Sequence, residues 1–132
     1  MKFKVNIKPM GKASVRVTRN GSHMPQTTKD FMNNIAWEFR KAFVGHRISL
    51  KPIRMDITAT FAVPPSISKK ERLRRLEMKY HTFKPDRDNI EKGVQDALNG
   101  LAYKDDSQVC DGRTLKLWGE EDSVEIEIVE II

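Results

Sequence analysis

The stretch IRMDITATFAV, residues 53–63, alternates between apolar and polar side chains along its length. Such alternation is typical of a strand that buries one face, because successive side chains of a strand point to opposite sides. Pro64 and Pro65 follow at once and are expected to end the strand, since proline cannot donate to a sheet. We therefore expect a central strand with these side chains in the core: Ile53, Met55, Ile57, Ala59, Phe61 and Val63.

Upstream of this strand, the sequence predicts a short strand, a hairpin and a helix. Residues 3–7 alternate like a half-buried strand, and the Asn-Gly pair at residues 20–21 favours a two-residue hairpin turn. Thr27 and Asp30 resemble a capping box at the start of a helix over residues 28–44. Apolar side chains at helical spacing should face the core: Phe31, Ile35, Phe39, Ala42 and Phe43.

Downstream, we expect two more helices and two more strands. Residues 68–79, SKKERLRRLEMK, favour a short, strongly basic helix, and strands are expected around residues 108–118 and 124–131. The sum is a single α+β domain over residues 1–132, a mixed β-sheet with two main helices packed on it and the short basic helix beside them. The second main helix ends near an Asn-Gly pair and has one apolar face: Ile90, Val94, Ala97, Leu98 and Leu101.

The amino-acid composition of the chain limits the classes of function that are plausible for it. The 132 residues carry a formal net charge of +6, which favours nucleic acid or another anionic surface as a partner. No apolar run reaches the length of a membrane span, so no membrane association is expected. Cys110 is the single cysteine, which excludes an intrachain disulfide and a cage of thiolate ligands, and a cytoplasmic location fits best.

Four carboxylates stand close together in this basic chain: Asp86, Asp88, Asp105 and Asp106. Asp86 and Asp88 are two residues apart, so in extended backbone they point the same way and can converge on one ion. Asp105 and Asp106 follow the second main helix. Ligands that offer only oxygen select a hard cation, Mg²⁺ or Mn²⁺. A structural interpretation stays open, because Asp88 can cap the helix, Lys92 can pair with it, and the other two can lie in a solvated turn.

The segment KPDRDNIEKGVQDALNG, followed by YKDDSQV, resembles the signature of the RusA family of Holliday junction resolvases. The shared order is D-x-D-N, a lysine one turn later, an amphipathic helix that ends in DAL, and then D-D-x-Q-V. The resemblance implies a RusA-like homodimeric endonuclease that depends on Mg²⁺, with Mn²⁺ as a substitute. It also implies that four-way junction DNA is cut by paired symmetric nicks, in recombination and repair.

Residue by residue, the resemblance implies that Asp86, Asp88 and Asp106 are the catalytic, metal-binding acids and that Lys92 is the essential lysine. Asn89 and Asp105 match motif positions without an assigned role. Some family members carry an arginine directly before the first acid, whereas this chain has Pro85 there. We therefore expect Lys84 or Arg87 to contact phosphate instead.

Further cations are candidates for contacts to the DNA backbone, although a solvated charged surface explains them equally well. They lie beside the hairpin turn and in the basic helix: Arg16, Arg19, Lys69, Lys70, Arg72, Arg74 and Arg75.

Other residues are expected to play structural parts. Trp37 and Trp118 should pack in the core, His81 should lie in a turn or on the surface, and Cys110 should be a buried small side chain. Asp111 is expected at an exposed strand position, and the alternative is that it supports the metal ligands from behind. A dimer interface could use the small residues Gly93 and Ala97.

Two other functions compete with a junction resolvase. One is a DNA-binding module without catalysis, whose acidic residues only affect folding. The other is a less selective metal-dependent nuclease of branched DNA such as flaps or forks.

Overall fold

The computed structural model describes residues 1–12, 16–19 and 21–132. Its helices are α1, α2, α3 and the short 3₁₀ helix η1, and the remaining elements are strands. In chain order they are β1 (Lys2–Val5), β2 (Arg16–Thr18), β3 (Gly21–His23), α1 (Gln26–Ala42), β4 (Ile53–Ala62), α2 (Lys69–Met78), α3 (Arg87–Leu98), η1 (Asp106–Gln108), β5 (Val109–Asp111), β6 (Thr114–Gly119) and β7 (Ser123–Glu130).

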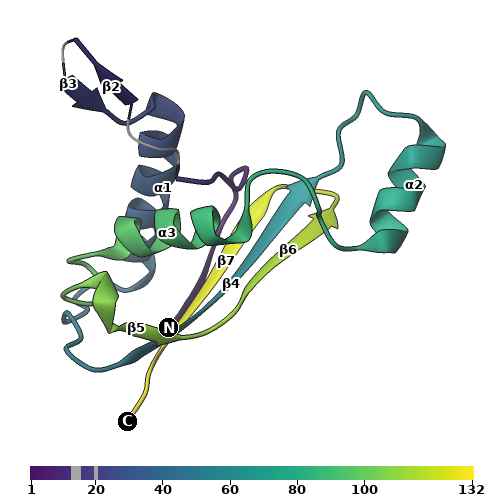
Figure 1. Cartoon of the computed structure of the whole chain (residues 1–132). Coiled ribbons are helices and arrows are strands. Elements are labelled where there is room, and N and C mark those ends of the chain that lie inside the picture. Colours follow the sequence, from purple (N-terminus) through teal and green to yellow (C-terminus); the bar gives the residue numbers. More distant parts are fainter. Residues whose placement is uncertain (13–15, 20) are drawn as a thin grey trace.

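A five-stranded mixed sheet forms the body of the fold, with β4 at its centre (Figure 1). β4 runs antiparallel to β7, and β7 runs antiparallel to β1 at the edge. On its other side, β4 pairs in parallel with β5 and then with β6. The predicted α+β class and the predicted central strand are therefore confirmed.

Gly112 separates β5 from β6, where the sequence predicts one strand over residues 108–118. Its φ is 134°, and a Cβ there would lie 1.8 Å from the carbonyl oxygen of Met55. Only a residue without a side chain allows the two backbones to approach so closely. The predicted strand is therefore two strands, and the pairing with β4 resumes at Ile57 and Thr114.

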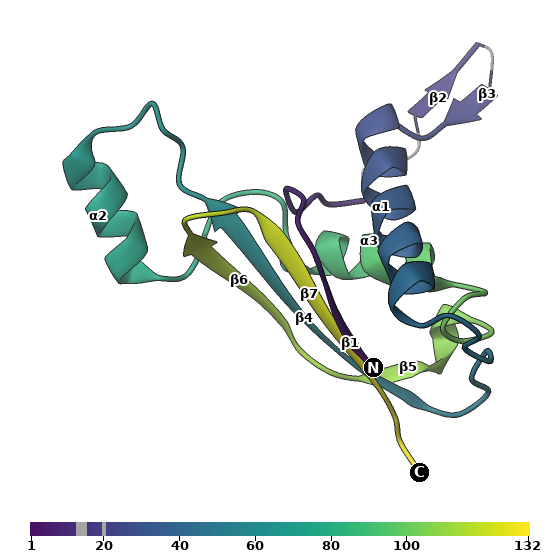
Figure 2. The same ribbon diagram turned by 180° about the vertical axis from the view of Figure 1, so that it is seen from behind.

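Two helices cover one face of the sheet. α1 and α3 pack against each other there, whereas α2 stands apart beyond the end of β4 (Figures 1 and 2). Each fully buried apolar side chain contributes roughly 1.5–3 kcal/mol, so this core holds α3 firmly in place. The core joins the apolar faces of both helices to β4 and β7: Phe31, Ile35, Phe39, Met55, Ile57, Ile90, Val94, Leu98, Ile126 and Ile128.

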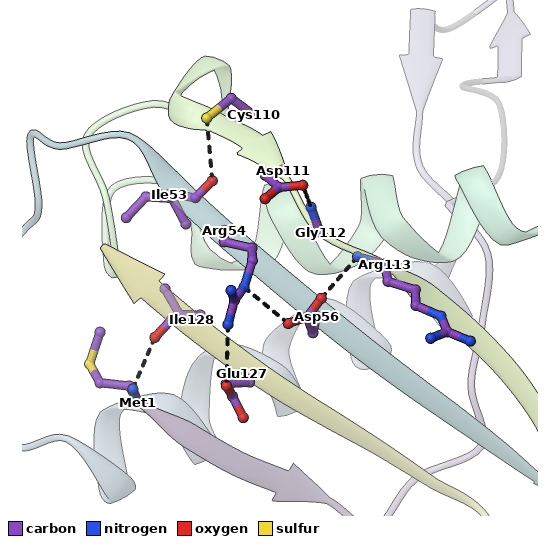
Figure 3. A network of polar contacts seen from close by, with 10 residues as sticks. All are labelled: Met1, Ile53, Arg54, Asp56, Cys110, Asp111, Gly112, Arg113, Glu127 and Ile128. Atoms are coloured by element: carbon purple, nitrogen blue, oxygen red, sulfur yellow. Dashed lines mark hydrogen bonds and ion pairs between the residues drawn. The ribbon is translucent and has the colours of Figure 1, made fainter. Parts of the chain in front are cut away.

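The opposite side of the sheet is polar. Arg54 lies between two carboxylates, with its Nε 3.3 Å from Asp56 and a terminal nitrogen 3.9 Å from Glu127 (Figure 3). Asp56 also accepts a hydrogen bond of 3.0 Å from the backbone N–H of Arg113, across the gap that Gly112 opens. Exposed pairs of this kind add little to stability, and this face is a solvated surface in the single chain.

α1 differs from the prediction at both ends. It begins at Gln26 after Pro25, and no side chain caps it, so the predicted capping box of Thr27 and Asp30 is wrong. Asp30 instead accepts a hydrogen bond of 2.9 Å from the side chain of Gln26. Ala42, expected in the core, is exposed at the last position of the helix, whereas Phe39 in the same turn is buried.

Two further predictions concern short segments. β2 pairs antiparallel with β3, as expected for the hairpin, while Asn20 of the predicted turn lies outside the described residues. α2 is a helix with no buried residue, and Ser68 caps it by accepting a hydrogen bond of 3.1 Å from Glu71 N–H. Within the described ranges, no helix is both long and apolar enough to cross a bilayer.

Candidate functional site

Asp86 stands at the N-terminus of α3, exposed to solvent, in extended backbone. Its carboxylate does not cap the helix. Lys84 Nζ donates to both of its oxygens instead, at 2.8 and 3.0 Å. This hydrogen bond and the lysine's positive charge lower the pKa of Asp86, and Asp86 in turn raises the pKa of Lys84. Asp86 is therefore ionised at neutral pH, and Lys84 is charged beside it.

Asp88 and Lys92 extend this polar surface along α3. Both are exposed, and they lie on the side of the helix opposite the buried Ile90 and Val94. Among the described residues, Asp88 and Lys92 form no ion pair with each other, and the N-cap position belongs to Asp86. The structural interpretation of Asp88 as a helix cap paired with Lys92 is therefore wrong.

The turn after α3 positions Asp105 and Asp106. Asp105 caps η1 by accepting a hydrogen bond of 3.2 Å from Ser107 N–H, and Gln108 accepts one of 2.9 Å from Asp105 N–H in return. Gln108 also donates to the carbonyl oxygens of Ser49 and Lys51, at 2.9 and 3.0 Å. Asp105 is thus a structural residue that fixes the turn, and Asp106 is the half-buried acid that the turn presents.

Asp106 lies against Asp96, an acid that the sequence patterns did not single out. Burial, a hydrogen bond with Asp96 and the negative charge of Asp105 raise the pKa of Asp106. Lys12 Nζ forms an ion pair with Asp96, and Lys12 N–H donates to Asn89 O at 3.0 Å. Asp96 follows Asp88 by two helical turns, and this spacing was the signal that could have identified it.

The predicted metal ligands Asp86, Asp88 and Asp106 do not form one group among the described residues. Within residues 1–12, 16–19 and 21–132, no three His, Cys, Asp or Glu side chains form a group that could hold an ion. Asp86 is engaged by Lys84, and Asp106 by Asp96. The donor chemistry nevertheless fits a hard divalent cation, because only oxygen is offered and a nearby positive charge favours the ionised form of Asp106, whose pKa is raised first by burial and then by Asp96 and Asp105.

The basic residues of α2 are largely paired within the protein. Arg72 pairs with Glu120, and Arg74 and Arg75 pair with Glu71 at 2.6 and 3.0 Å. Lys69 and Lys70 are exposed and form no ion pair in the described part of the chain. Arg87 and Arg19 are also exposed, and the side chain of Arg16 lies outside the description.

Three predictions about single residues are wrong. Trp37 is 58% exposed on α1, although Trp118 is buried as expected. His81 is buried and stacks on Phe61 at 3.7 Å between ring centroids, and burial is the main cause that lowers its pKa to about 4. Cys110 is exposed rather than buried, because β5 is a short strand whose outward positions are open.

Two small residues of α3 face inward. Gly93 and Ala97 are buried, and a Cβ on Gly93 would lie 3.4 Å from the ring of Phe31 in α1. Both residues are buried within the chain and offer no surface to a partner, so the possibility that a dimer interface uses them is wrong. Asp111 is exposed on β5, as expected, and accepts a hydrogen bond of 2.8 Å from Gly112 N–H.

Comparisons with known proteins identify the family to which this arrangement of acids and lysine belongs. The sequence model described as Endodeoxyribonuclease RusA matches residues 6–129. "Uncharacterized protein YqaN" of Bacillus subtilis (strain 168) is 39% identical over 142 residues, covering 99% of this chain and 96% of that protein. "Crossover junction endodeoxyribonuclease rusA" of Lactococcus phage r1t is 33% identical over 81 residues, covering 61% of this chain and 56% of the phage protein.

Proposed function

The chain belongs to the RusA family of endodeoxyribonucleases and is therefore a nuclease that hydrolyses DNA, and from that premise we propose that its substrate is the four-way junction. The phage relative carries the name of a crossover junction endodeoxyribonuclease. In this proposal the protein cuts two opposed strands by paired symmetric nicks, as a step of recombination and repair. A four-way junction has approximate two-fold symmetry, so a C₂ dimer with one site per opposed strand matches it.

One observation carries the proposal most directly. Asp86 at the N-cap of α3, and Asp88 and Lys92 on its outer face, are all exposed in the described part of the chain, in the order of the family motif. A helix surface that served only stability has no need of two acids and a lysine in this order. The packing of α1 against the buried side of α3 holds the three residues at fixed positions relative to one another.

Asp86, Asp88 and Asp106 are the residues that would hold Mg²⁺, with Mn²⁺ as a substitute. Bound there, the ion would supply an activated water and charge stabilisation for the leaving oxygen. When an ion is bound, Asp86 would no longer hold the ammonium of Lys84, and Lys84 would be free to contact a phosphate. Asp96 holds Asp106 in place and is itself held by Lys12, so these two act as positioning residues.

In this proposal Lys92 contacts the DNA phosphate at which cleavage occurs. Its ammonium is exposed one turn after Asp88, where it can offset the charge that builds on the phosphate in the transition state. The cations Lys69, Lys70, Lys84 and Arg87 would contact the DNA backbone, because they are exposed on the described surface. We expect a smaller contribution to DNA binding from Arg72, Arg74 and Arg75, because their charges are already paired with carboxylates of the protein.

A titration with Mg²⁺ or Mn²⁺ tests this function. The substrates are a labelled immobile four-way junction, a flap and a linear duplex of the same sequence, incubated with the intact protein. The proposal expects ion-dependent nicks at symmetric positions of the junction and little cutting of the duplex. Equal cutting of flap and junction would favour a less selective nuclease, and binding without nicks at every ion concentration would favour a DNA-binding module.

A further inference from the structure

A cavity of about 830 Å³ opens beside the start of α3. Its walls come from segments that are distant in the sequence: residues 8–12, the end of β4 with residues 63–65, residues 81–86, and β6. Asp86 and Asn89 of the candidate site form part of the same wall. The volume lies in the range of about 300–1,000 Å³ that is usual for ligand pockets, and the cleavage chemistry uses only the edge that carries Asp86.

Aromatic rings make up much of this wall. His81 lies 4.4 Å from Trp118 between ring centroids, and Phe83 lies 5.9 Å from Trp118. The guanidinium of Arg75 lies over the rings of Phe83 and Trp118, at 5.0 and 4.9 Å from their centroids. Phe83 is half-exposed, with Lys116 Nζ fixing its backbone carbonyl at 2.5 Å. The cavity therefore offers ring faces to a planar group, and Arg75 already occupies them in that way.

Two ring nitrogens in this wall have no partner. Trp118 and His81 are only 8% and 7% exposed, yet Trp118 Nε1 and His81 Nδ1 make no hydrogen bond with any described residue. A buried tryptophan N–H normally finds an acceptor, because an unpaired buried donor is costly. The two nitrogens therefore point to a ligand that carries hydrogen-bonding groups at the edge of a planar ring.

The charge of the cavity favours an anion. Lys8, Lys12, Arg75 and Lys84 line it, against the carboxylates of Asp86 and Asp122. Lys12, Arg75 and Lys84 are paired with Asp96, Glu71 and Asp86, so among the described lining residues the unpaired positive charge is that of Lys8. Asp122 is already used, since it accepts a hydrogen bond of 2.8 Å from Ala62 N–H. A ligand with a flat polar ring and flanking negative charge satisfies all of these features, and a nucleotide within a DNA strand is such a ligand.

We propose that this cavity binds one unstacked nucleobase of the DNA substrate, next to the phosphate attacked at Asp86 and Asp88. The identity of the substrate rests on the proposed function. The base stacks on the half-exposed ring of Phe83 in place of the guanidinium of Arg75, and Trp118 Nε1–H and the ring of His81 hydrogen-bond its edge. Lys8, and Lys84 once it is released from Asp86, contact the phosphates on either side of the base.

The two tryptophans of the chain provide a direct binding test. Trp37→Phe removes the exposed tryptophan on α1, outside the cavity, and leaves Trp118 as the only fluorescent tryptophan. Trp118→Phe leaves Trp37 alone and serves as the matched control. Each intact variant is titrated, in EDTA so that no cleavage occurs, with a short single-stranded oligonucleotide, the same strand made entirely of abasic sugars, and inorganic phosphate.

The proposal expects the oligonucleotide with bases to quench Trp118 and to leave Trp37 nearly unchanged. The abasic strand and phosphate should bind without quenching. Phe83→Leu, combined with Trp37→Phe, should weaken the affinity for the strand with bases about 5-fold or more, the reduction expected for one base–aromatic stack. The same change should leave the affinity for the abasic strand unaltered, and thermal melting checks that each variant is folded.

Equal quenching of Trp118 by the intact and the abasic strand would overturn the proposal and show that the cavity takes only the sugar–phosphate backbone. An absence of Trp118 quenching by strands that do bind would overturn it as well. These readouts need no catalysis. Failure of the wild-type protein to nick a junction in Mg²⁺ would count against the proposed function, and it is independent of the result on base binding.

Discussion

Lys84 donates to both carboxylate oxygens of Asp86, at 2.8 and 3.0 Å, directly before the first turn of α3. The pair joins the first acid of the candidate site to a lysine that we expect, from the sequence, to contact phosphate. It also means that the charge of one lysine at the site is neutralised in the free protein. If an ion or a substitution removes Asp86 from this pair, the positive charge of Lys84 is released beside the start of α3.

Asp86→Asn, Asp88→Asn and Asp106→Asn are each expected to abolish cleavage while junction binding stays equal or becomes stronger. Each change removes a metal-binding charge and some repulsion of DNA at nearly constant shape, and Asp86→Asn also frees Lys84. Gel-shift titration and single-turnover cleavage measure the two effects. Glu77→Gln neutralises an exposed carboxylate on α2 and is the control. Near wild-type nicking by one of the three variants would remove that residue from the site.

Lys92→Ala should lower the single-turnover cleavage rate severely and change junction affinity little. One phosphate contact is a small part of total binding, whereas charge placed at the reacting phosphate acts in the transition state. Lys29→Ala on the exposed surface of α1 is the matched control. Equal rates for the Lys92 and Lys29 variants would mean that Lys92 is only a surface residue.

Lys69 and Lys70 should contribute more to DNA binding than the arginines of the same helix. Arg72 and Arg74 are paired with Glu120 and Glu71, whereas both lysines are free of ion pairs within the described residues. Neutralising both lysines to Gln should reduce the slope of log affinity against log salt by about 0.9 for each DNA phosphate that is no longer neutralised. Neutralising Arg72 and Arg74 should reduce it less. A larger decrease in slope for the arginine variant than for the lysine variant would show that DNA phosphates displace Glu71 and Glu120 and pair with the arginines.

The sequence predicts the core of this protein well, because the spacing of apolar residues along a strand or a helix shows which face is buried. The alternation in residues 53–63 identified β4, and the helical spacing of Ile90 and Val94 identified the buried face of α3. The same helical spacing puts Asp88 and Lys92 on the opposite face of α3, which is exposed. These inferences need only local geometry, and local geometry is what a single sequence contains.

Contacts between distant segments could not be predicted in this way. Asp96 meets Asp106 and Lys12 only because the turn at η1 and residues 9–12 both fold back onto α3. His81 is buried because residues 79–81 run along β6, where His81 N–H donates to Lys116 O at 3.1 Å. No periodicity indicates such pairings, so the surface role predicted for His81 was wrong.

His81 should make stability depend on pH. Burial, with the nearby positive charges of Lys116 and Arg75, lowers its pKa from 6.5 to about 4 in the folded protein. The unfolded chain therefore binds more protons between these two values, and stability falls as pH drops through that window. The decrease in unfolding free energy is at most roughly 3 kcal/mol.

His81→Phe keeps a ring against Phe61 and removes the titration. Urea denaturation at several pH values between about 7 and 4 should show a steeper fall of unfolding free energy for the wild type than for this variant. Parallel pH profiles for the two proteins would contradict the assignment of a low pKa to His81.

The proposed resolution of junctions is tested most directly on a supercoiled plasmid that extrudes a cruciform, incubated with the intact protein in Mg²⁺. Two opposed nicks made within the lifetime of one complex convert the plasmid to linear DNA, whereas a single nick gives only a relaxed circle. We predict linear product that requires Mg²⁺ and disappears with Asp88→Asn. Relaxed circles alone, or an uncut plasmid that the protein nevertheless binds, would contradict the proposed function.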